Sequence, residues 1–323
     1  MNRMTTRPIR FYLISGLSLV LCSCGGSGST AVDTPDPGNP PPEPPPPVLL
    51  ADAATDHAFL TDHFSGSQNC SLCHDGLQDE NGQDLSIVAD WKATMMAAGS
   101  RDPLWRAKVA SEIKRFPELR EEIESECARC HVPMAHVEAE FVSADVTLFD
   151  DGLLHPDNVL FDAAAESVSC TLCHQVSDTA ELGTDAGFSG SFEIPFSFGT
   201  ARLAFGQYSN LLTAPMVNQV AFTPTMSPHI SDSEMCATCH NLSTTVIDSQ
   251  GSPTNQTFPE QMVYTEWENS SFAATQSCQD CHMPRAAGNV TISTRPMNSS
   301  LPARPDFARH IFVGANTYML TET

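Results

Sequence analysis

The chain has 323 residues, and its 39 Asp and Glu outnumber its 16 Lys and Arg, so the formal net charge is −23. This acidity argues against nucleic-acid binding and against docking on anionic lipid headgroups, because both depend on basic surfaces. Apolar residues make up 41% of the chain, slightly less than the roughly 45–50% of average globular proteins. We therefore expect something besides side chains to fill the core, and the 12 Cys and 11 His indicate what it is.

Residues 1–23 are typical of a bacterial lipoprotein signal peptide. Three arginines within the first ten residues precede an apolar run over residues 11–21, which is too short to span a bilayer. The run ends in Leu-Cys-Ser-Cys-Gly, so we predict lipidation at Cys24. Several acyl chains on one cysteine make a stable anchor. An ordinary cleaved signal peptide is the alternative.

Residues 24–50 are predicted to be a lipid-anchored linker without a core. Glycine and serine dominate its start, and the proline-rich stretch over residues 36–47 favours a stiff, extended spacer. Loss of the signal peptide removes three arginines and no acid, so the mature charge is −26. Gly25 after the lipidated cysteine resembles outer-membrane sorting signals, with the periplasmic or surface side left open.

Residues 51–323 are expected to form one body, with one or two lobes, that is mainly α-helical with much irregular structure. Apolar residues at helical spacing predict a helix over 104–126 that leads directly to Cys127, and Pro117 should break or restart it. The other predicted elements are helices over 85–98 and 267–274 and short strands over 190–198 and 289–293.

Five copies of Cys-x-x-Cys-His lie in this body, and they use every cysteine in it. Two thiols at this spacing reach the two vinyl groups of one haem, and the following histidine then lies under the iron as its proximal ligand. We therefore predict five covalently attached c-type haems, around which the body is built as a stack. The motifs, numbered 1 to 5 in chain order, are Cys70, Cys73 and His74; Cys127, Cys130 and His131; Cys170, Cys173 and His174; Cys236, Cys239 and His240; and Cys278, Cys281 and His282.

Three other uses of paired cysteines were weighed. Zinc sites would favour an even number of Cys-x-x-Cys units and do not demand a histidine after each unit. Redox dithiols do not occur five to a chain of this kind. Disulfides are permitted in an exported protein, but they do not account for the histidine either.

Six further histidines are candidates for the second, distal iron ligand, and five irons need five of them. His63 and His229 lie in a repeat, His-apolar-Ser-x-Ser-x-x-Cys-x-x-Cys-His, which predicts two equivalent haem sites. Methionine is the alternative distal ligand, and it would raise the reduction potential. The six histidines are His57, His63, His136, His155, His229 and His310.

These candidates differ in position. His136 follows His131 too closely to reach the opposite face of the same haem, so we expect it to bind a neighbouring haem. His310 should bind a distal site and fix the C-terminal tail on the body. His155 is an intermediate candidate, and His57, next to the linker, is the weakest.

Over residues 61–320 the chain resembles multihaem c-type cytochromes, in particular the superfamily of tetrahaem cytochrome c and hydroxylamine oxidoreductase. This resemblance implies closely packed haems, in parallel and perpendicular pairs, that pass electrons along a chain. Five haems depart from the tetrahaem pattern, so ligands are not transferred from it one by one. The phrases that carry it are CQDCHMP over residues 278–284, SCTLCHQ over 169–175 and MCATCHNL over 235–242.

The sequence thus favours an electron carrier or conduit of the cell envelope, of the anaerobic-respiration type. A haem reductase of a nitrogen or metal substrate is the first alternative. Pentahaem nitrite reductases replace the motif histidine by lysine at the catalytic haem, whereas all five motifs here end in histidine. Hydroxylamine oxidoreductases use more haems and a tyrosine crosslink, and only Tyr208, Tyr264 and Tyr318 follow the leader.

A subunit of an extracellular cytochrome filament is the second alternative, and a homo-oligomer is left open with it. The expected partners are redox proteins with basic docking surfaces, which an acidic protein attracts most strongly at low salt.

Overall fold

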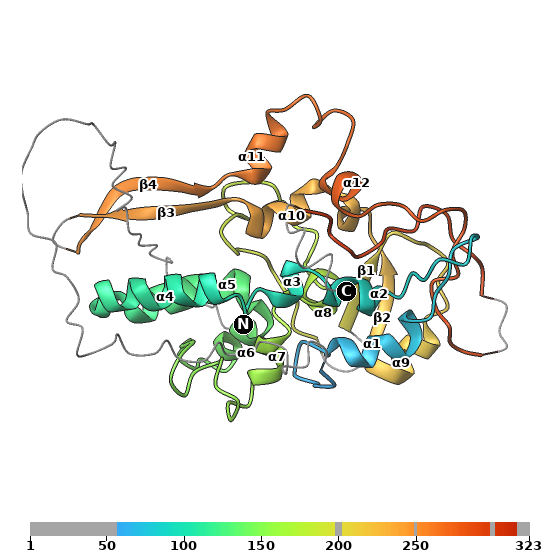
Figure 1. The fold of residues 1–323 in the computed structure, drawn as a ribbon, viewed down its shortest axis with the longest axis horizontal. Coiled ribbons are helices and arrows are strands. Elements are labelled where there is room, and N and C mark those ends of the chain that lie inside the picture. The colour runs from blue at the N-terminus through green and yellow to red at the C-terminus, as the bar shows by residue number, and fades with distance from the viewer. Residues whose placement is uncertain (1–56, 198–201, 249–250, 298–300, 315–323) are drawn as a thin grey trace, which may run out of the picture.

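A computed structural model describes residues 57–197, 202–248, 251–297 and 301–314. The predicted signal peptide, the lipidation site Cys24 and the whole predicted linker lie outside these residues. The described chain is a set of short helices and irregular segments with two small sheets (Figure 1). None of the helices in the described ranges has the length and apolar character needed to cross a bilayer.

The helix predicted over 104–126 is present, and Pro117 divides it as expected. Asp102 caps the first half by accepting a hydrogen bond from the Leu104 N–H, and Pro103 occupies the first helical position. The helix predicted over 85–98 is divided too, because Thr94 caps a new helix by accepting from the Ala97 N–H. The helices of this half are α1 Ser67–His74, α2 Ile87–Lys92, α3 Met95–Ala98, α4 Pro103–Arg115, the 3₁₀ turn Pro117–Leu119, α5 Arg120–His131, α6 Pro133–Phe141, α7 Phe161–Ala165 and α8 Cys170–Cys173.

The second half contains the sheets, and here the sequence predictions were wrong in place. No strand forms over 190–197, and within 289–293 only Val290 makes an isolated bridge, to Arg304. The helix expected over 267–274 begins earlier and ends at Glu268. The helices are α9 Ala214–Val220, the 3₁₀ turn Pro228–Ser231, α10 Ser233–His240, α11 Val263–Glu268 and α12 Cys278–His282; the strands are β1 Arg202–Gly206, β2 Phe222–Met226, β3 Leu242–Ile247 and β4 Pro253–Gln261.

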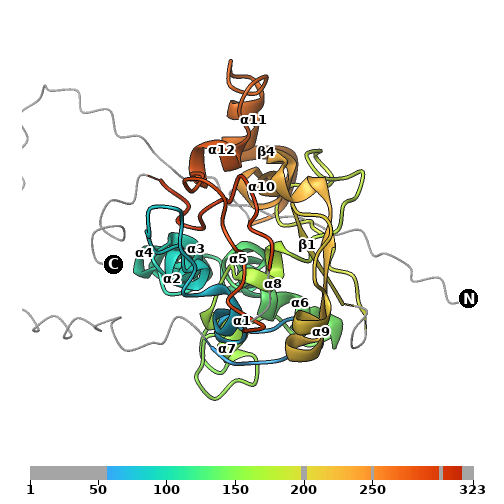
Figure 2. The ribbon, with the colours of Figure 1, turned by 90° about the vertical axis from the view of Figure 1, so that its right-hand side faces the viewer.

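The two sheets have two strands each: β1 pairs with β2 in parallel, and β3 pairs with β4 as an antiparallel hairpin. The hairpin extends over α4 and α5 (Figure 1), and Glu260 of β4 acts electrostatically on Glu126 of α5. Seen from the end (Figure 2), α11 and α12 lie at the top and α1, α7 and α9 at the bottom.

The largest cluster of buried apolar side chains lies between the helices of the first half. Phe64, Met134, Leu148 and Leu172 belong to it and are almost fully buried. Because Phe64 precedes motif 1 and Leu172 lies inside motif 3, this core packs two of the Cys-x-x-Cys-His segments against each other. The fold therefore brings motifs together that are a hundred residues apart in the chain.

Candidate haem-binding sites

Each Cys-x-x-Cys-His motif lies on a short helix or at a helix end. Motif 2 ends α5, motifs 1 and 4 end α1 and α10, and motif 5 forms α12. Motif 3 forms α8, and His174 is its C-cap residue. Residues three and four apart share one face of a helix, so each helix presents its two thiols and its imidazole on one side. This is the arrangement that attachment of one haem per motif needs.

Each of the five motif histidines has a polar contact at Nδ1. Four of them donate from Nδ1 to a backbone carbonyl in a distant segment, and His240 Nδ1 lies 3.3 Å from the amide nitrogen of Gln261. A metal-binding histidine is typically fixed in this way through its other ring nitrogen. Among the described residues no polar partner occupies Nε2 of these rings. The four carbonyl contacts are His74 to Ile292 at 2.9 Å, His131 to Gly99 at 3.3 Å, His174 to Phe205 at 2.6 Å and His282 to Val313 at 2.5 Å.

Burial keeps most of these imidazoles uncharged. Desolvation lowers the pKa of His74, His131, His174 and His240. A neutral imidazole is the form that binds a metal. In addition, the indole of Trp105 stacks on the His131 ring at a centroid distance of 4.5 Å and an angle of 10°, which fixes that ring further.

The ten cysteines of the body are free thiols in the structure, and none forms a disulfide. Thiols of different motifs are neighbours. Burial and the nearby Cys170 thiol raise the pKa of Cys70, and Cys239 has the same effect on Cys130. Cys278 is in turn the neighbour that raises the pKa of Cys236. Motifs 1 and 3, 2 and 4, and 4 and 5 therefore meet through their attachment residues.

A hydrogen-bonded junction joins motif 1 to motif 3. The buried Glu166 carboxylate accepts from the Ser67 hydroxyl at 2.9 Å and from the Ser169 hydroxyl at 2.6 Å. Thr171 donates to the Ser65 carbonyl at 2.9 Å, and Gln175 Nε2 donates to the His63 carbonyl at 3.0 Å. The segment that precedes Cys70 is thus bound along α8.

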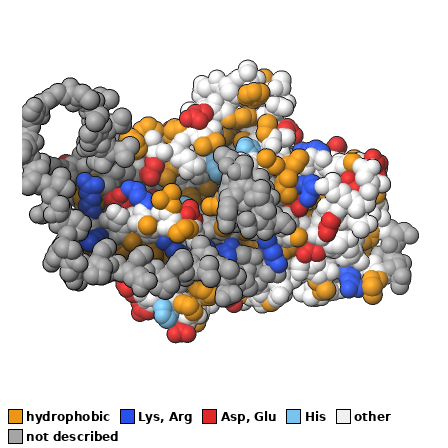
Figure 3. Space-filling view, viewed as in Figure 1, with side chains coloured by type: hydrophobic (Ala, Val, Ile, Leu, Met, Phe, Trp, Pro, Cys, Tyr) orange, Lys and Arg blue, Asp and Glu red, His pale blue; other side chains and the backbone are white. Residues whose placement is uncertain are grey.

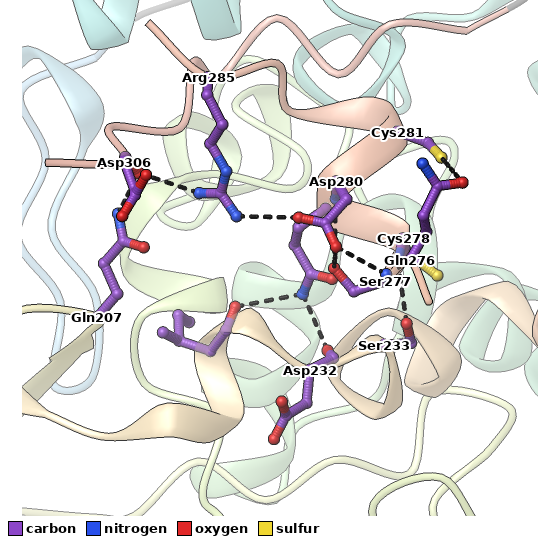
Figure 4. Close-up of polar contacts among 12 residues, drawn as sticks. Gln207, Asp232, Ser233, Gln276, Ser277, Cys278, Asp280, Cys281, Arg285 and Asp306 are labelled. Atoms are coloured by element: carbon purple, nitrogen blue, oxygen red, sulfur yellow. Dashed lines mark hydrogen bonds and ion pairs between the residues drawn. The ribbon is translucent and has the colours of Figure 1, made fainter. Parts of the chain in front are cut away.

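A similar junction joins motif 4 to motif 5 (Figure 4). The Cys278 N–H donates to the Ser233 hydroxyl at 2.9 Å, and Gln279 Nε2 donates to the Asp232 carbonyl at 2.9 Å. Ser277 and Asp280 cap α12 reciprocally. In both copies of the repeat, the segment that precedes one motif therefore packs against a second motif. A glutamine of that second region, Gln175 or Gln279, donates to a backbone carbonyl of the repeat segment.

His310 lies beside the proximal histidine of motif 3. The ring centroids of His174 and His310 are 6.3 Å apart, and the ring planes differ by 25°. Two imidazoles on one metal each bind it through a nitrogen at about 2 Å, so their rings lie close on either side of it. Burial lowers the pKa of His310 to about 3, so this ring is neutral as well. The centroid distance and the buried, neutral rings suit two imidazoles that share one metal ion.

His63 is buried in an aromatic and acidic environment. Phe141 and Phe196 flank its ring at centroid distances of 4.8 and 5.2 Å, and each keeps about two fifths of its surface exposed. Nδ1 lies 3.2 Å from Oε2 of Glu138, and among the described residues Nε2 has no polar partner. Thus His63 offers one nitrogen to a ligand beside an accessible apolar surface.

The remaining distal candidates differ in how available they are. His136 is buried, its pKa is lowered to about 3 by desolvation, and Ser125 Oγ lies 3.4 Å from its Nε2. Both ring nitrogens of His229 are occupied, by Ser227 Oγ at 2.7 Å and the Val176 carbonyl at 2.9 Å. His155 lies on a loop with 44% of its side chain exposed, and His57 pairs with Asp162 at 3.0 Å. Iron binding by these residues stays a prediction.

The donor set fits haem attachment: paired thiols on one helix face, followed by imidazoles whose Nε2 has no polar partner among the described residues. No group of three or more His, Cys, Asp or Glu in the described ranges is arranged to hold a bare metal ion. Sequence reasoning missed Trp105, Glu138 and Glu166. A signal for Glu138 existed, since it follows four apolar residues and His136 on helix α6, where a carboxylate is unusual.

Comparison with known proteins gives no match to this chain, whether with protein-family models, with curated proteins or with solved structures.

Proposed function

We propose that the protein is an electron-transfer conduit of the cell envelope that carries five covalently bound c-type haems. The observation that carries this proposal is the common geometry of the five motifs, each with its thiols on one helix face and four of five imidazoles held at Nδ1 by a distant carbonyl. When bound, haem supplies one-electron chemistry. The chain supplies attachment, axial ligands and the spacing between sites.

The neighbouring thiols support a conduit rather than five separate sites. Motif 4 is close to three others: Cys239 neighbours Cys130, Cys236 neighbours Cys278, and both act electrostatically with Cys173 of motif 3. Motif 1 joins through Cys70 and Cys170. The order of neighbours is then 1, 3 and 4, with motifs 2 and 5 both adjoining motif 4, and it differs from the order in the chain.

A reductase is the second candidate, because both ring nitrogens of His229 are occupied within the protein. An iron without a distal ligand is open to substrate. Carbon monoxide binding to the reduced protein separates the two functions. A conduit with five distal ligands binds none, whereas one equivalent bound by the native protein would favour the reductase.

The proposal places the body on a membrane through Cys24, with residues 25–50 as the spacer. Its partners are redox proteins with basic docking surfaces, and the mature charge of −26 supports this choice. Figure 3 shows acidic, basic and hydrophobic side chains intermingled on the face that it presents. The attraction therefore rests on the overall charge more than on a single acidic patch of that face.

A further inference from the structure

The two copies of the His-apolar-Ser-x-Ser repeat differ in the group beside Nδ1 of the histidine. In one copy, Nδ1 of His229 lies 2.7 Å from the neutral hydroxyl of Ser227. In the other, Nδ1 of His63 lies 3.2 Å from a carboxylate oxygen of Glu138. The two sites are thus equivalent in sequence, but the group beside Nδ1 is a hydroxyl at His229 and a carboxylate at His63.

Glu138 is held firmly in place beside His63. Its other oxygen, Oε1, accepts from the backbone N–H of His63 at 2.8 Å, so both carboxylate oxygens address the same residue. Both side chains are at least 95% buried. From β1, the buried Arg202 contributes a positive charge whose interaction with Glu138 and Asp62 is favourable. An anion at this depth therefore has a counter-charge and a donor.

We propose that Glu138 is a positioning residue whose buried carboxylate, 3.2 Å from Nδ1 of His63, lowers the reduction potential of the haem bound by His63. A carboxylate at the far nitrogen makes an imidazole a stronger base, and a more electron-rich ligand favours the oxidised iron. Among the five motif histidines, four have a neutral carbonyl at Nδ1 and the fifth has a neutral amide. His57 and His136 also have a carboxylate near Nδ1, but those carboxylates are more than half exposed, whereas Glu138 is buried, so its charge is the least screened of the three.

This inference rests on the proposed function, and the experiment separates the two. The holoprotein is first weighed to count its haems, and His63→Ala is examined for one high-spin, carbon monoxide-binding haem. Absence of haem overturns the proposed function. Five haems with an unchanged spectrum in His63→Ala overturn only the role of His63, and the inference with it.

Spectroscopic redox titration of Glu138→Gln then tests Glu138 itself. We expect the reduction potential of one of the five haems to rise by about 59 mV, which is a tenfold change in its ratio of reduced to oxidised form at a fixed potential. All five haems should stay low-spin. Glu121→Gln on α5 removes one exposed charge away from His63 and should shift no single haem. Five unchanged potentials in Glu138→Gln, or an equal shift in Glu121→Gln, overturn the inference.

Glu138→Asp provides a second variant in case the glutamine protein does not retain five haems. It keeps the charge but withdraws the oxygens by one methylene, so the same haem should shift in the same direction by a smaller amount. A downward shift or no shift in that haem contradicts the assignment.

Discussion

The imidazoles of His174 and His310 lie with their ring centroids 6.3 Å apart and their planes 25° from parallel. One comes from motif 3 and the other from the C-terminal segment, 136 positions later in the chain. Arg309, next to His310, pairs with Asp90 at 2.6 Å and holds this segment against α2. The pair places the C-terminal segment beside the motif 3 histidine, where the proposed haem would need a second ligand.

Replacement of His310 by alanine should therefore leave one iron with an open position. We expect five haems to remain attached, because the thioethers do not depend on His310, and one haem to become high-spin and bind carbon monoxide. Electron paramagnetic resonance and carbon monoxide difference spectra measure this. His155→Ala is the matched removal of an exposed imidazole and should leave the spectrum as it is. An unchanged His310→Ala spectrum would show that the ring is not a ligand.

Loss of motif 4 should disturb electron distribution more than loss of motif 1. The thiols of motif 4 adjoin those of motifs 2, 3 and 5, whereas those of motif 1 adjoin motif 3 alone. A Cys236→Ala/Cys239→Ala protein should reduce in several kinetic phases with a donor that delivers electrons at one site. The matched Cys70→Ala/Cys73→Ala protein should keep a single phase. Equal kinetics for the two four-haem proteins would contradict the proposed order.

Glu166 should be a major contributor to stability. Its buried carboxylate accepts four donors, from the backbone of His57 and Ser67 and from the hydroxyls of Ser67 and Ser169. Glu166→Ala leaves these donors unpaired, and we expect a loss of about 2–4 kcal/mol in the free energy of unfolding. Denaturant unfolding followed by circular dichroism measures it. The exposed Glu121→Ala should change stability by less than about 0.5 kcal/mol; similar losses in both would refute the junction's role.

The same residue gives stability a pH dependence with a defined sign. Burial raises the pKa of Glu166, so the folded state holds its proton more readily than the unfolded chain does. The stability that protonation of Glu166 adds to the folded state is fully present below the unfolded pKa and is lost as the pH rises through the folded pKa. Comparison of native and Glu166→Ala unfolding across this range should show that the variant lacks this decline. An identical pH dependence would contradict it.

Membrane attachment should depend on Cys24 and not on Cys22. Cys24→Ser removes the lipidated thiol, so the protein should move from the membrane fraction to the soluble fraction, as measured by fractionation and by fatty-acid labelling. Cys22→Ser, two residues away, should remain in the membrane. Release by the Cys22 change alone would move the lipidation site, and retention of both variants would exclude a lipid anchor at either cysteine.

Local features of the sequence predicted part of this structure well. The division at Pro117 and the helix that leads to Cys127 follow from signals within a few residues. The strands were misplaced because β4 is a polar segment that begins at Pro253 and also contains Pro259, and its pairing with β3 depends on contacts rather than on an alternating pattern.

The environment of each candidate ligand was less accessible to sequence reasoning. The repeat around His63 and His229 predicted equivalent sites, yet Glu138 lies 75 positions from His63 and reaches it only through packing of α6. Likewise, the carbonyls of Ile292 and Val313 that hold His74 and His282 carry no side-chain signal at all. Spacing thus predicts the attachment chemistry, whereas the groups that orient the ligands depend on the tertiary fold.

The central claim, that one haem is attached to each of the five motifs, is tested most directly by the intact mass of the mature protein purified from a host that exports it and attaches c-type haem. The account predicts the mass of the polypeptide, with its lipid, plus five haems that survive denaturation. A mass without haem, or with fewer than five on a homogeneous product, would contradict it.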